Sequence, residues 1–339
     1  MNTDILITLY KQYTGQRHES IEPLTGSGSN RRYYRMRGCK NLIGVCGESI
    51  EENRAFIYMA RHFRNKGIPV PEVLAISEDE SCYIQEDLGD TLLFNAITNG
   101  RTTGEFSDYE KGLIRKSIAR LPSIQFKGAE EMDFGMCYPL SDFNRRTVMW
   151  DLNYFKYCFL KVTGINFNEN SLEDDFEAFT DILLGTPSET FMYRDFQSRN
   201  VIIKDEEPYF IDFQGGRKGP VYYDVASFLW QAKANFNNDL REEMIDTYIS
   251  EANKFTIINP EDFKKTLHHF VIFRTMQVLG AYGFRGLLER KAHFIESIPY
   301  ALNNLQTLLK HHSNEYPYLS KLLMQLSELD INSIKTLKR

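Results

Sequence analysis

The stretch that decides the fold is FMYRDFQSRNVIIKDEEPYFIDF, residues 191–213. Two short runs rich in β-branched and aromatic residues, VIIK at 201–204 and YFID at 209–212, flank the turn-forming residues DEEP at 205–208. Short runs of this composition on either side of a turn predict a β-hairpin.

Three oxygen-bearing side chains gather near the open end of this predicted hairpin. With the turn at 205–208, Asn200 is expected opposite Phe213 and therefore beside Asp212. Asp195 stands just before the first strand. Alone, such an aspartate is typical of a capped turn or a strand end. Together, an amide oxygen and a carboxylate suit Mg²⁺, and a separate carboxylate can accept the proton of an acceptor hydroxyl. The arrangement predicts phosphoryl transfer, with Asp195 as the base and Asn200 and Asp212 on the metal.

Toward the N-terminus the sequence predicts a small β-rich part. An amphipathic helix ending at Gly15 comes first. A second helix, EENRAFIYMARHFRNKG, has apolar residues at helical spacing and a glycine at its end. The strand candidates around it are IEPLTG, RRYYRMR, NLIGVCG, EVLAIS and SCYIQED.

A loop rich in small residues, TGSGSNRR at 25–32, lies between the first two strand candidates. Small residues let backbone N–H groups approach phosphates closely, although a plain hairpin turn has the same composition. Arg31 and Arg32 follow directly and are close enough to reach a phosphate. We therefore expect the nucleotide to contact Ser27, Gly28, Ser29, Asn30, Arg31 and Arg32.

Beyond Gly89 the pattern is helical almost to the end, with the hairpin as its one interruption. A long periodic region at about 239–327 predicts successive helices. The chain is thus expected to be an α+β protein of two lobes. Residues 1–86 form a β-rich nucleotide-binding lobe, and residues 87–339 form a helical lobe carrying the hairpin and the acceptor site.

Composition excludes several classes of protein. The 339 residues include 40 basic and 46 acidic side chains, a net charge of −6, which argues against a general nucleic-acid binder. No apolar run approaches the roughly 18 residues of a membrane span, and the N-terminus lacks the basic segment of a signal peptide. We expect a cytoplasmic monomer that acts on a small molecule, without nucleic-acid or membrane partners. The five cysteines are odd in number and widely spaced, which predicts reduced thiols.

These motifs resemble the aminoglycoside phosphotransferase family, which has the protein-kinase-like fold. The match is similar, in particular, to bacterial amino-sugar kinases that phosphorylate N-acetylmuramate and N-acetylglucosamine at the anomeric hydroxyl. The resembling segments are GSGSNRRYYRMR, IPVPEVLAISEDESCYIQEDLGD, MYRDFQSRNVII, YFIDFQGGRKGPVYYDVASFL and FRTMQVLGAYGFRGLLERKAHFIESIPYALNNL.

The resemblance implies ATP and Mg²⁺ as cofactors and assigns further roles. It places the catalytic base on Asp195 and the metal ligands on Asn200 and Asp212. It makes Asp224 the structural carboxylate that braces the catalytic loop. It also places Glu86 and Leu88 at a hinge, with Asp87 between them, whose backbone would hold adenine.

The sequence departs from the family pattern in three places. Tyr193 stands where the family has a bracing histidine, and Gln214 stands where a glycine follows the D-F pair. The strand NLIGVCG also lacks the lysine that kinase-like folds use to hold phosphates. We expect Arg199, inside the catalytic loop, or the Arg31–Arg32 pair to supply that positive charge, with Glu52 as its helix partner.

The acceptor is less determined than the reaction. The aromatic helix WDLNYFKYCFL belongs to the lobe that would face the acceptor, which makes Asp151 and Tyr154 candidate sugar contacts. Core packing is the alternative explanation for its aromatic residues. A choline, amino-alcohol or aminoglycoside acceptor remains an alternative, as does a nucleotide-binding regulatory pseudokinase.

Overall fold

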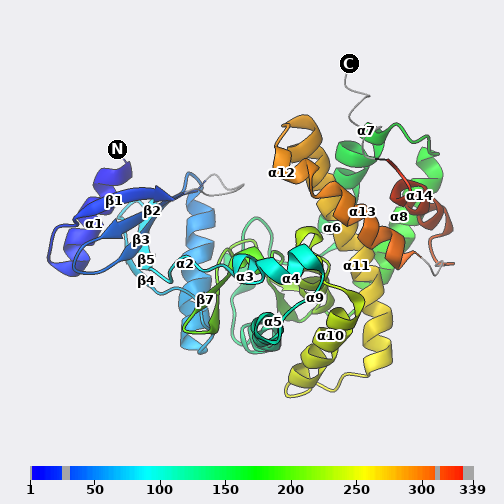
Figure 1. Cartoon of the computed structure of the whole chain (residues 1–339). Coiled ribbons are helices and arrows are strands. Elements are labelled where there is room, and N and C mark those ends of the chain that lie inside the picture. Colours follow the sequence, from blue (N-terminus) through cyan, green and yellow to red (C-terminus); the bar gives the residue numbers. More distant parts are fainter. Residues whose placement is uncertain (1, 25–30, 310–313, 331–339) are drawn as a thin grey trace. The chain divides into compact units, whose positions relative to one another are not determined.

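The computed structural model describes residues 2–24, 31–309 and 314–330 (Figure 1). The chain divides into two compact units. The first consists of Met1–Ile97, Asp108–Asp142 and Thr190–Lys218, and the second of Thr98–Ser107, Phe143–Glu189 and Gly219–Arg339. The predicted hairpin therefore lies in the same unit as the N-terminal strands. The predicted lobe boundary after residue 86 stays a prediction.

An antiparallel sheet of five strands, in the order β1-β2-β3-β5-β4, forms the core of the first unit. It confirms the five strand candidates and the two expected helices, of which one precedes the first strand and the other lies between the third and fourth. The elements are α1 (Asn2–Thr14), β1 (Ser20–Leu24), β2 (Arg32–Arg37), β3 (Leu42–Cys46), α2 (Ile50–Asn65), β4 (Val73–Ile76) and β5 (Cys82–Glu86).

The two faces of this sheet have different partners. On one face Leu42, Cys82 and Ile84 pack with Leu6 and Leu9 of α1. Because side chains alternate along a strand, the residues between them point to the other face. There the ring of Tyr83 stacks on Phe56 of α2, with ring centroids 5.3 Å apart. The second face is thus free of α1 and faces α2.

Helix α2 ends as its sequence predicts, and a serine that the sequence analysis did not single out caps its start. The side chain of Ser49 accepts a hydrogen bond from the backbone N–H of Glu52 and caps the N-terminus. Gly67, which follows the last turn, adopts a positive φ of 74°. The buried Phe56 stacks on Phe213 at 4.8 Å between centroids, and Phe63 packs edge-on against Phe191 at 5.0 Å. These contacts fix α2 against the segment around the hairpin.

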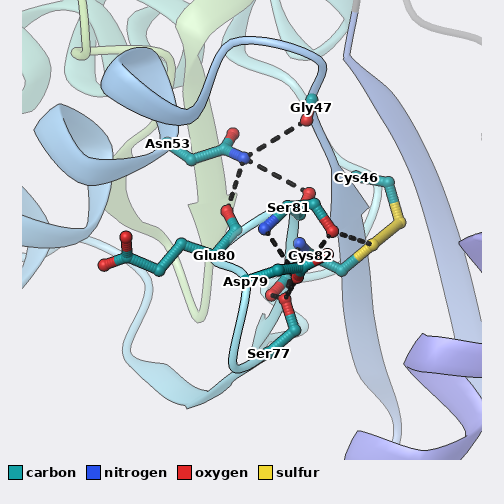
Figure 2. The surroundings of a disulfide bond; sticks show 8 residues. All are labelled: Cys46, Gly47, Asn53, Ser77, Asp79, Glu80, Ser81 and Cys82. Atoms are coloured by element: carbon teal, nitrogen blue, oxygen red, sulfur yellow. Dashed lines mark hydrogen bonds between the residues drawn. A yellow bond between two sulfur atoms is a disulfide. The ribbon is translucent and has the colours of Figure 1, made fainter.

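A disulfide joins β3 to β5 and corrects the expectation that all five cysteines are reduced. Cys46 and Cys82 stand directly opposite each other in the strand register and are bonded (Figure 2). Their 36-residue separation in sequence gave no sign of this pairing, because only the register brings them together. Beside them, the Nδ2 of Asn53 donates to the carbonyl oxygens of Gly47, Glu80 and Ser81.

The remainder of the first unit is built from short strands and helices. Strands β6 and β9 form one two-stranded sheet, and β7 and β8 form another. The elements are α3 (Leu93–Ala96), α5 (Asp108–Pro122), η1 (Ser123–Lys127), η2 (Phe134–Met136), β6 (Thr190–Met192), η4 (Ser198–Asn200), β7 (Val201–Lys204), β8 (Glu207–Phe210) and β9 (Arg217–Gly219).

The second unit is helical, as the long periodic region predicts. Its central helix is α11, whose Phe270, Phe273 and Met276 are fully buried. The helices are α4 (Thr98–Thr103), α6 (Arg145–Phe155), η3 (Lys156–Leu160), α7 (Lys161–Thr163), α8 (Glu169–Leu184), α9 (Tyr222–Leu229), η5 (Ala232–Ala234), α10 (Asn238–Ala252), α11 (Pro260–Tyr282), η6 (Gly283–Leu288), α12 (Ala292–Ile295), α13 (Ile298–Leu308) and α14 (Pro317–Ser327). In the described part of the chain, none of the helices has both the length and the apolar character needed to cross a membrane.

Candidate active site

The hairpin forms, but its turn differs from the predicted one. Strands β7 and β8 are joined by Asp205 and Glu206 alone, and Val201 pairs with Phe210. Both turn residues have positive φ, 52° and 61°, as in the two-residue turns whose twist matches that of paired strands. The predicted turn residue Pro208 lies in β8 instead. A two-stranded sheet has only edge strands, and an edge strand tolerates a proline.

The shifted register still brings the predicted oxygen ligands together. Asn200 lies opposite Ile211, not Phe213, and its carbonyl accepts a hydrogen bond from the Ile211 N–H at 3.0 Å. Asp212 follows directly. The Asn200 Nδ2 donates to the backbone carbonyl of Asp195 at 2.8 Å, so one amide ties the segment of Asp195 to the base of the hairpin. Sequence reasoning therefore grouped these residues correctly, although for a register that is wrong by two residues.

Tyr193 contributes a brace where the family pattern has histidine. Its side chain is almost fully buried, and its hydroxyl donates a hydrogen bond to the backbone carbonyl of Ile211. This contact holds the residue just before Asp212. Asp212 itself has a positive φ of 67°, uncommon for a residue with a side chain and typical of functional loops.

The carboxyl of Asp212 lies in a crowded electrostatic environment. Burial raises its pKa, the hydrogen bond from Gln214 Nε2 to Oδ1 at 2.8 Å lowers it, and the nearby charge of Asp195 raises it again. Arg31 acts in the opposite direction to Asp195 and favours the ionised form. A carboxylate that feels a second negative charge favours a nearby cation.

The oxygen atoms of this site suit a magnesium ion that shares its ligands with phosphate and water better than a metal ion held by protein side chains alone. Within the described ranges, no group of three or more His, Cys, Asp or Glu side chains is arranged to hold a metal ion. Magnesium in phosphoryl-transfer sites uses one or two carboxylates together with phosphate oxygens and water. Asn200 and Asp212 fit that pattern, because the Asn200 amide nitrogen is engaged by Asp195 and its oxygen is the atom left for a ligand.

A buried arginine stands near these carboxylates. Arg31, directly before β2, places Nη2 3.2 Å from the carboxylate of Glu52 and 3.0 Å from the backbone oxygen of the same residue. Its guanidinium also lies 5.5 Å from the centre of the Phe56 ring. Arg31 and Glu52 were both candidates from the sequence, and their role toward phosphate stays a prediction. Arg32 is exposed at the start of β2, and Ser27, Gly28, Ser29 and Asn30 lie outside the described residues.

A cavity of about 360 Å³ opens between the sheet and the hairpin within the first unit. The predicted hinge residues Glu86 and Leu88 both line it, as does Asp87. One wall is a cross-strand row in which Arg35 pairs with Ile43 and Ile43 pairs with Gln85. The remaining lining residues are Leu24, Tyr33, Phe56, Gly89, Asp90, Leu92, Asn200, Ile202, Ile211 and Asp212.

Sequence reasoning missed the role of Arg35. This buried arginine places Nε 2.8 Å from Asp87 and Nη1 2.6 Å from Asp90, and so fastens the hinge segment to β2. The basic run at 31–37 was a signal, but Arg35 and Arg37 share one face of the strand, and only the surrounding structure buries Arg35 while Arg37, at the strand end, stays exposed. Lys204 likewise anchors Glu86, at 2.8 Å.

The other predicted site residues are Arg199, which lies in η4 beside Asn200, and three residues of the second unit. The guanidinium of Arg199 stacks 4.5 Å from the centre of the Phe94 ring. Asp224 is fully buried in the first turn of α9, in the second unit. Asp151 and Tyr154 lie on α6 of that unit, where burial raises the pKa of Tyr154 to about 12.

Comparison with known proteins agrees with this geometry. Residues 160–256 match the model of a phosphotransferase enzyme family. The chain is 24% identical over 304 residues to the N-acetylmuramate/N-acetylglucosamine kinase of Neisseria meningitidis serogroup B, covering 87% of each protein. It is 22% identical over 315 residues to the enzyme of that name from Pseudomonas aeruginosa, covering 90% of this chain and 88% of the relative. The chain is a phosphotransferase that acts on a hydroxyl acceptor.

Solved structures establish the fold of this phosphotransferase. Choline kinase from Cryptosporidium parvum superposes with a TM-score of 0.62 at 12% identity, covering 95% of this chain and 99% of that structure. The GDP complex of aminoglycoside 2′-phosphotransferase-IIIa gives a TM-score of 0.60 at 12% identity, covering 89% and 96%. The predicted kinase-like α+β fold and the predicted family resemblance are both confirmed.

Proposed function

We propose that this phosphotransferase is an ATP-dependent sugar kinase whose acceptor is the anomeric hydroxyl of an N-acetyl amino sugar. The observation that carries the proposal is the arrangement of Asp195, Asn200 and Asp212 around one hairpin base beside the cavity. The amino-sugar acceptor is supported by the names of relatives that match along most of the chain.

Each of the three residues has a separate task in this mechanism. Asp195 accepts the proton of the acceptor hydroxyl while the new bond forms between that oxygen and the γ-phosphorus. The bond from the γ-phosphorus to the bridging oxygen breaks, and ADP leaves. Asn200 and Asp212 would hold Mg²⁺, which neutralises phosphate charge when bound.

The Arg31–Glu52 pair completes the nucleotide side of the site. Glu52 orients the guanidinium, a group that can grip phosphate oxygens in a bidentate manner. This pair argues against the pseudokinase alternative, because it provides the cation that the missing lysine would otherwise supply. We keep Arg32 and the segment Ser27–Asn30 as further phosphate contacts, and Glu86 and Leu88 as the adenine hinge.

The remaining assignments concern the catalytic loop and the acceptor. Arg199 is proposed to support transfer from within the loop that carries Asp195. Asp224 is proposed to brace that loop, and Asp151 and Tyr154 to contact the sugar.

The test replaces the proposed base without changing its size. We expect Asp195→Asn to lower kcat about 10²–10⁴-fold, because general-base catalysis is lost, while the affinity for ADP stays unchanged. The matched control is Asp205→Asn in the hairpin turn, where asparagine also tolerates a positive φ. Turnover is followed as ADP release with N-acetylmuramate, N-acetylglucosamine, choline and an aminoglycoside as acceptors. An Asp195→Asn variant with the wild-type rate would remove that residue from the mechanism.

The product identifies the acceptor hydroxyl. Phosphorylation at the anomeric position removes the reducing end of the sugar and gives an acid-labile phosphate. A phosphorylated sugar that keeps its reducing end would contradict the anomeric assignment. A wild-type protein that releases no ADP with any acceptor would favour the pseudokinase.

A further inference from the structure

Three aromatic side chains lie at the surface of the second unit. Trp150 and Tyr154 are one turn apart on α6, and side chains at this spacing share a helix face. Trp150 is 54% exposed. The ring of Phe284 in η6, itself 37% exposed, lies 6.2 Å from the ring of Tyr154. Exposed apolar surface bordered by polar groups is typical of a ligand-binding site.

Close backbone packing places this aromatic group. Helices α6 and α11 each continue into a short π-helix, η3 and η6, a feature that is frequent at functional sites. A Cβ at Gly280 of α11 would lie 2.9 Å from the backbone nitrogen of Phe155. A Cβ at Gly283 would overlap the backbone oxygen of Cys158. The two glycines therefore let η6 lie directly against α6 and η3, which holds Phe284 beside Tyr154.

The segment that carries Phe284 is basic. Residues 283–291, GFRGLLERK, contain three basic side chains and one acid. Two of the cations share that acid. Nη1 of Arg285 lies 3.0 Å from both carboxylate oxygens of Glu289, and Nζ of Lys291 lies 2.9 Å from one of them. Because one carboxylate faces two cations, positive charge remains beside the aromatic group.

Arg285 presents one edge of its guanidinium to a ligand. In the described part of the chain only its Nη1 makes a hydrogen bond, and Nε and Nη2 donate to no protein group. The side chain is 36% exposed, so a solute can reach it. The guanidinium lies 5.6 Å from the centre of the Phe284 ring. Its Nε–Nη2 edge is a planar fork of N–H groups that matches the two oxygens of a carboxylate.

We propose that Arg285 binds the carboxylate of an anionic sugar while the aromatic group packs on the sugar ring, an inference that rests on the proposed sugar kinase and names its acceptor as a sugar acid. A pyranose exposes C–H groups on its faces, and these can be buried against aromatic rings. N-acetylmuramate carries a carboxylate, whereas N-acetylglucosamine is neutral. Choline and aminoglycosides are cations. Aromatic rings alone can hold a quaternary ammonium group, but the basic residues beside them repel it.

Two acidic side chains near this site do not reverse its preference. The hydrogen bonds from Lys291 and Arg285 lower the pKa of Glu289, so this carboxylate stays ionised and paired. Asp151, on α6, is 8% exposed and is already proposed to contact the sugar. Its carboxylate can accept hydrogen bonds from sugar hydroxyl groups. Burial raises the pKa of Tyr154 to about 12, and the nearby charge of Arg285 acts in the opposite direction, which agrees with their closeness.

The experiment compares an acid with its neutral counterpart. N-acetylmuramate, its carboxamide and N-acetylglucosamine are offered to the wild type and to Arg285→Gln, and ADP release gives kcat and KM for each sugar. In the wild type we expect the KM for the acid to be about tenfold below that for the carboxamide, the effect of one charge-assisted hydrogen-bonded contact. In Arg285→Gln the KM for the acid should rise about tenfold, while kcat and the KM for N-acetylglucosamine stay unchanged.

Controls separate recognition of charge from a structural effect. Arg145→Gln makes the same change at the start of α6, in an exposed side chain paired with Glu177 and Asp181, and should leave every KM unaltered. The double variant Arg285→Gln with Glu289→Gln should show the same rise as Arg285→Gln. A return of its KM to the wild-type value would assign the rise to repulsion by Glu289 and would overturn the proposal.

The remaining outcomes distinguish this inference from the proposed function. A wild-type KM for the acid that is no lower than those for the neutral sugars would overturn the role of Arg285 and leave the sugar kinase intact. So would an unchanged KM for the acid in Arg285→Gln. A wild type that turns over none of the three sugars would overturn both.

Discussion

Replacing Arg31 with alanine tests the cation beside the proposed phosphate site. The Arg31 side chain is 2% exposed and the Glu52 side chain is 29% exposed, with 3.2 Å between the charged groups. The variant leaves the Glu52 carboxylate without its guanidinium. It also removes the positive charge that favours ionisation of Asp212. We expect loss of both folding stability and phosphate binding.

The size of the stability loss follows from the exposure of the remaining charge. Breaking a fully buried ion pair costs about 3–5 kcal/mol. Water reaches part of Glu52, which reduces this cost to about 2 kcal/mol. The lost contact with the Phe56 ring adds about 0.5–1 kcal/mol. The free energy of unfolding should therefore fall by about 2–3 kcal/mol.

The assay combines urea unfolding with two ligands. The matched control is Arg37→Ala at the end of β2, whose partner Glu22 lies 3.7 Å away with both side chains about half exposed. Such a surface pair contributes about 0–1 kcal/mol. Arg31→Ala should weaken ADP binding far more than adenosine binding, because only ADP carries phosphates. Equal weakening of both ligands, or a wild-type urea midpoint, would refute the reasoning.

Two further perturbations probe the segment that follows the hairpin and the second unit. Gly216→Ala should lower the free energy of unfolding by about 1–3 kcal/mol, because a Cβ there would lie 2.1 Å from the Phe191 ring. Gly215→Ala is the control: a Cβ at that position meets open space, and the same urea titration should show little change. Burial lowers the pKa of His269 below its ordinary 6.5, so the folded state resists its protonation and stability is lost as the pH falls below that value. His269→Gln should reduce the difference in unfolding free energy between pH 7.5 and pH 5.5. A retained difference in this variant would contradict the assignment.

The fold could be predicted because its signals are local. The apolar spacing and the terminal glycine of α2, and the short β-rich runs around it, depend on neighbours within a few residues. The hairpin turn shows the limit of that approach. Pro208 is a strong turn signal in the sequence. In the structure it lies in β8 and pairs with Ile203, and the turn consists of Asp205 and Glu206 alone.

The parts of the site that the sequence did not reveal depend on register. Cys46 meets Cys82, and Arg35 meets Asp87 and Asp90, only because strands distant in sequence lie side by side. The burial of Gln85 in the cavity wall was not predicted, for a related reason. A glutamine in a strand is typical of a solvent-facing position, and its burial follows from the elements that cover that face.

The strand register also explains how an arginine can replace the missing lysine. In kinase-like folds the phosphate-binding lysine stands on the third strand. Here the cavity-side residues of β3 are Ile43 and Val45, and Tyr33 of β2 lies opposite Val45. Because Arg31 precedes Tyr33 by two residues, both point to the same face. The longer arginine side chain then reaches Glu52 from the residue just before β2, and we propose that this ion pair takes the place of the one that the missing lysine would form.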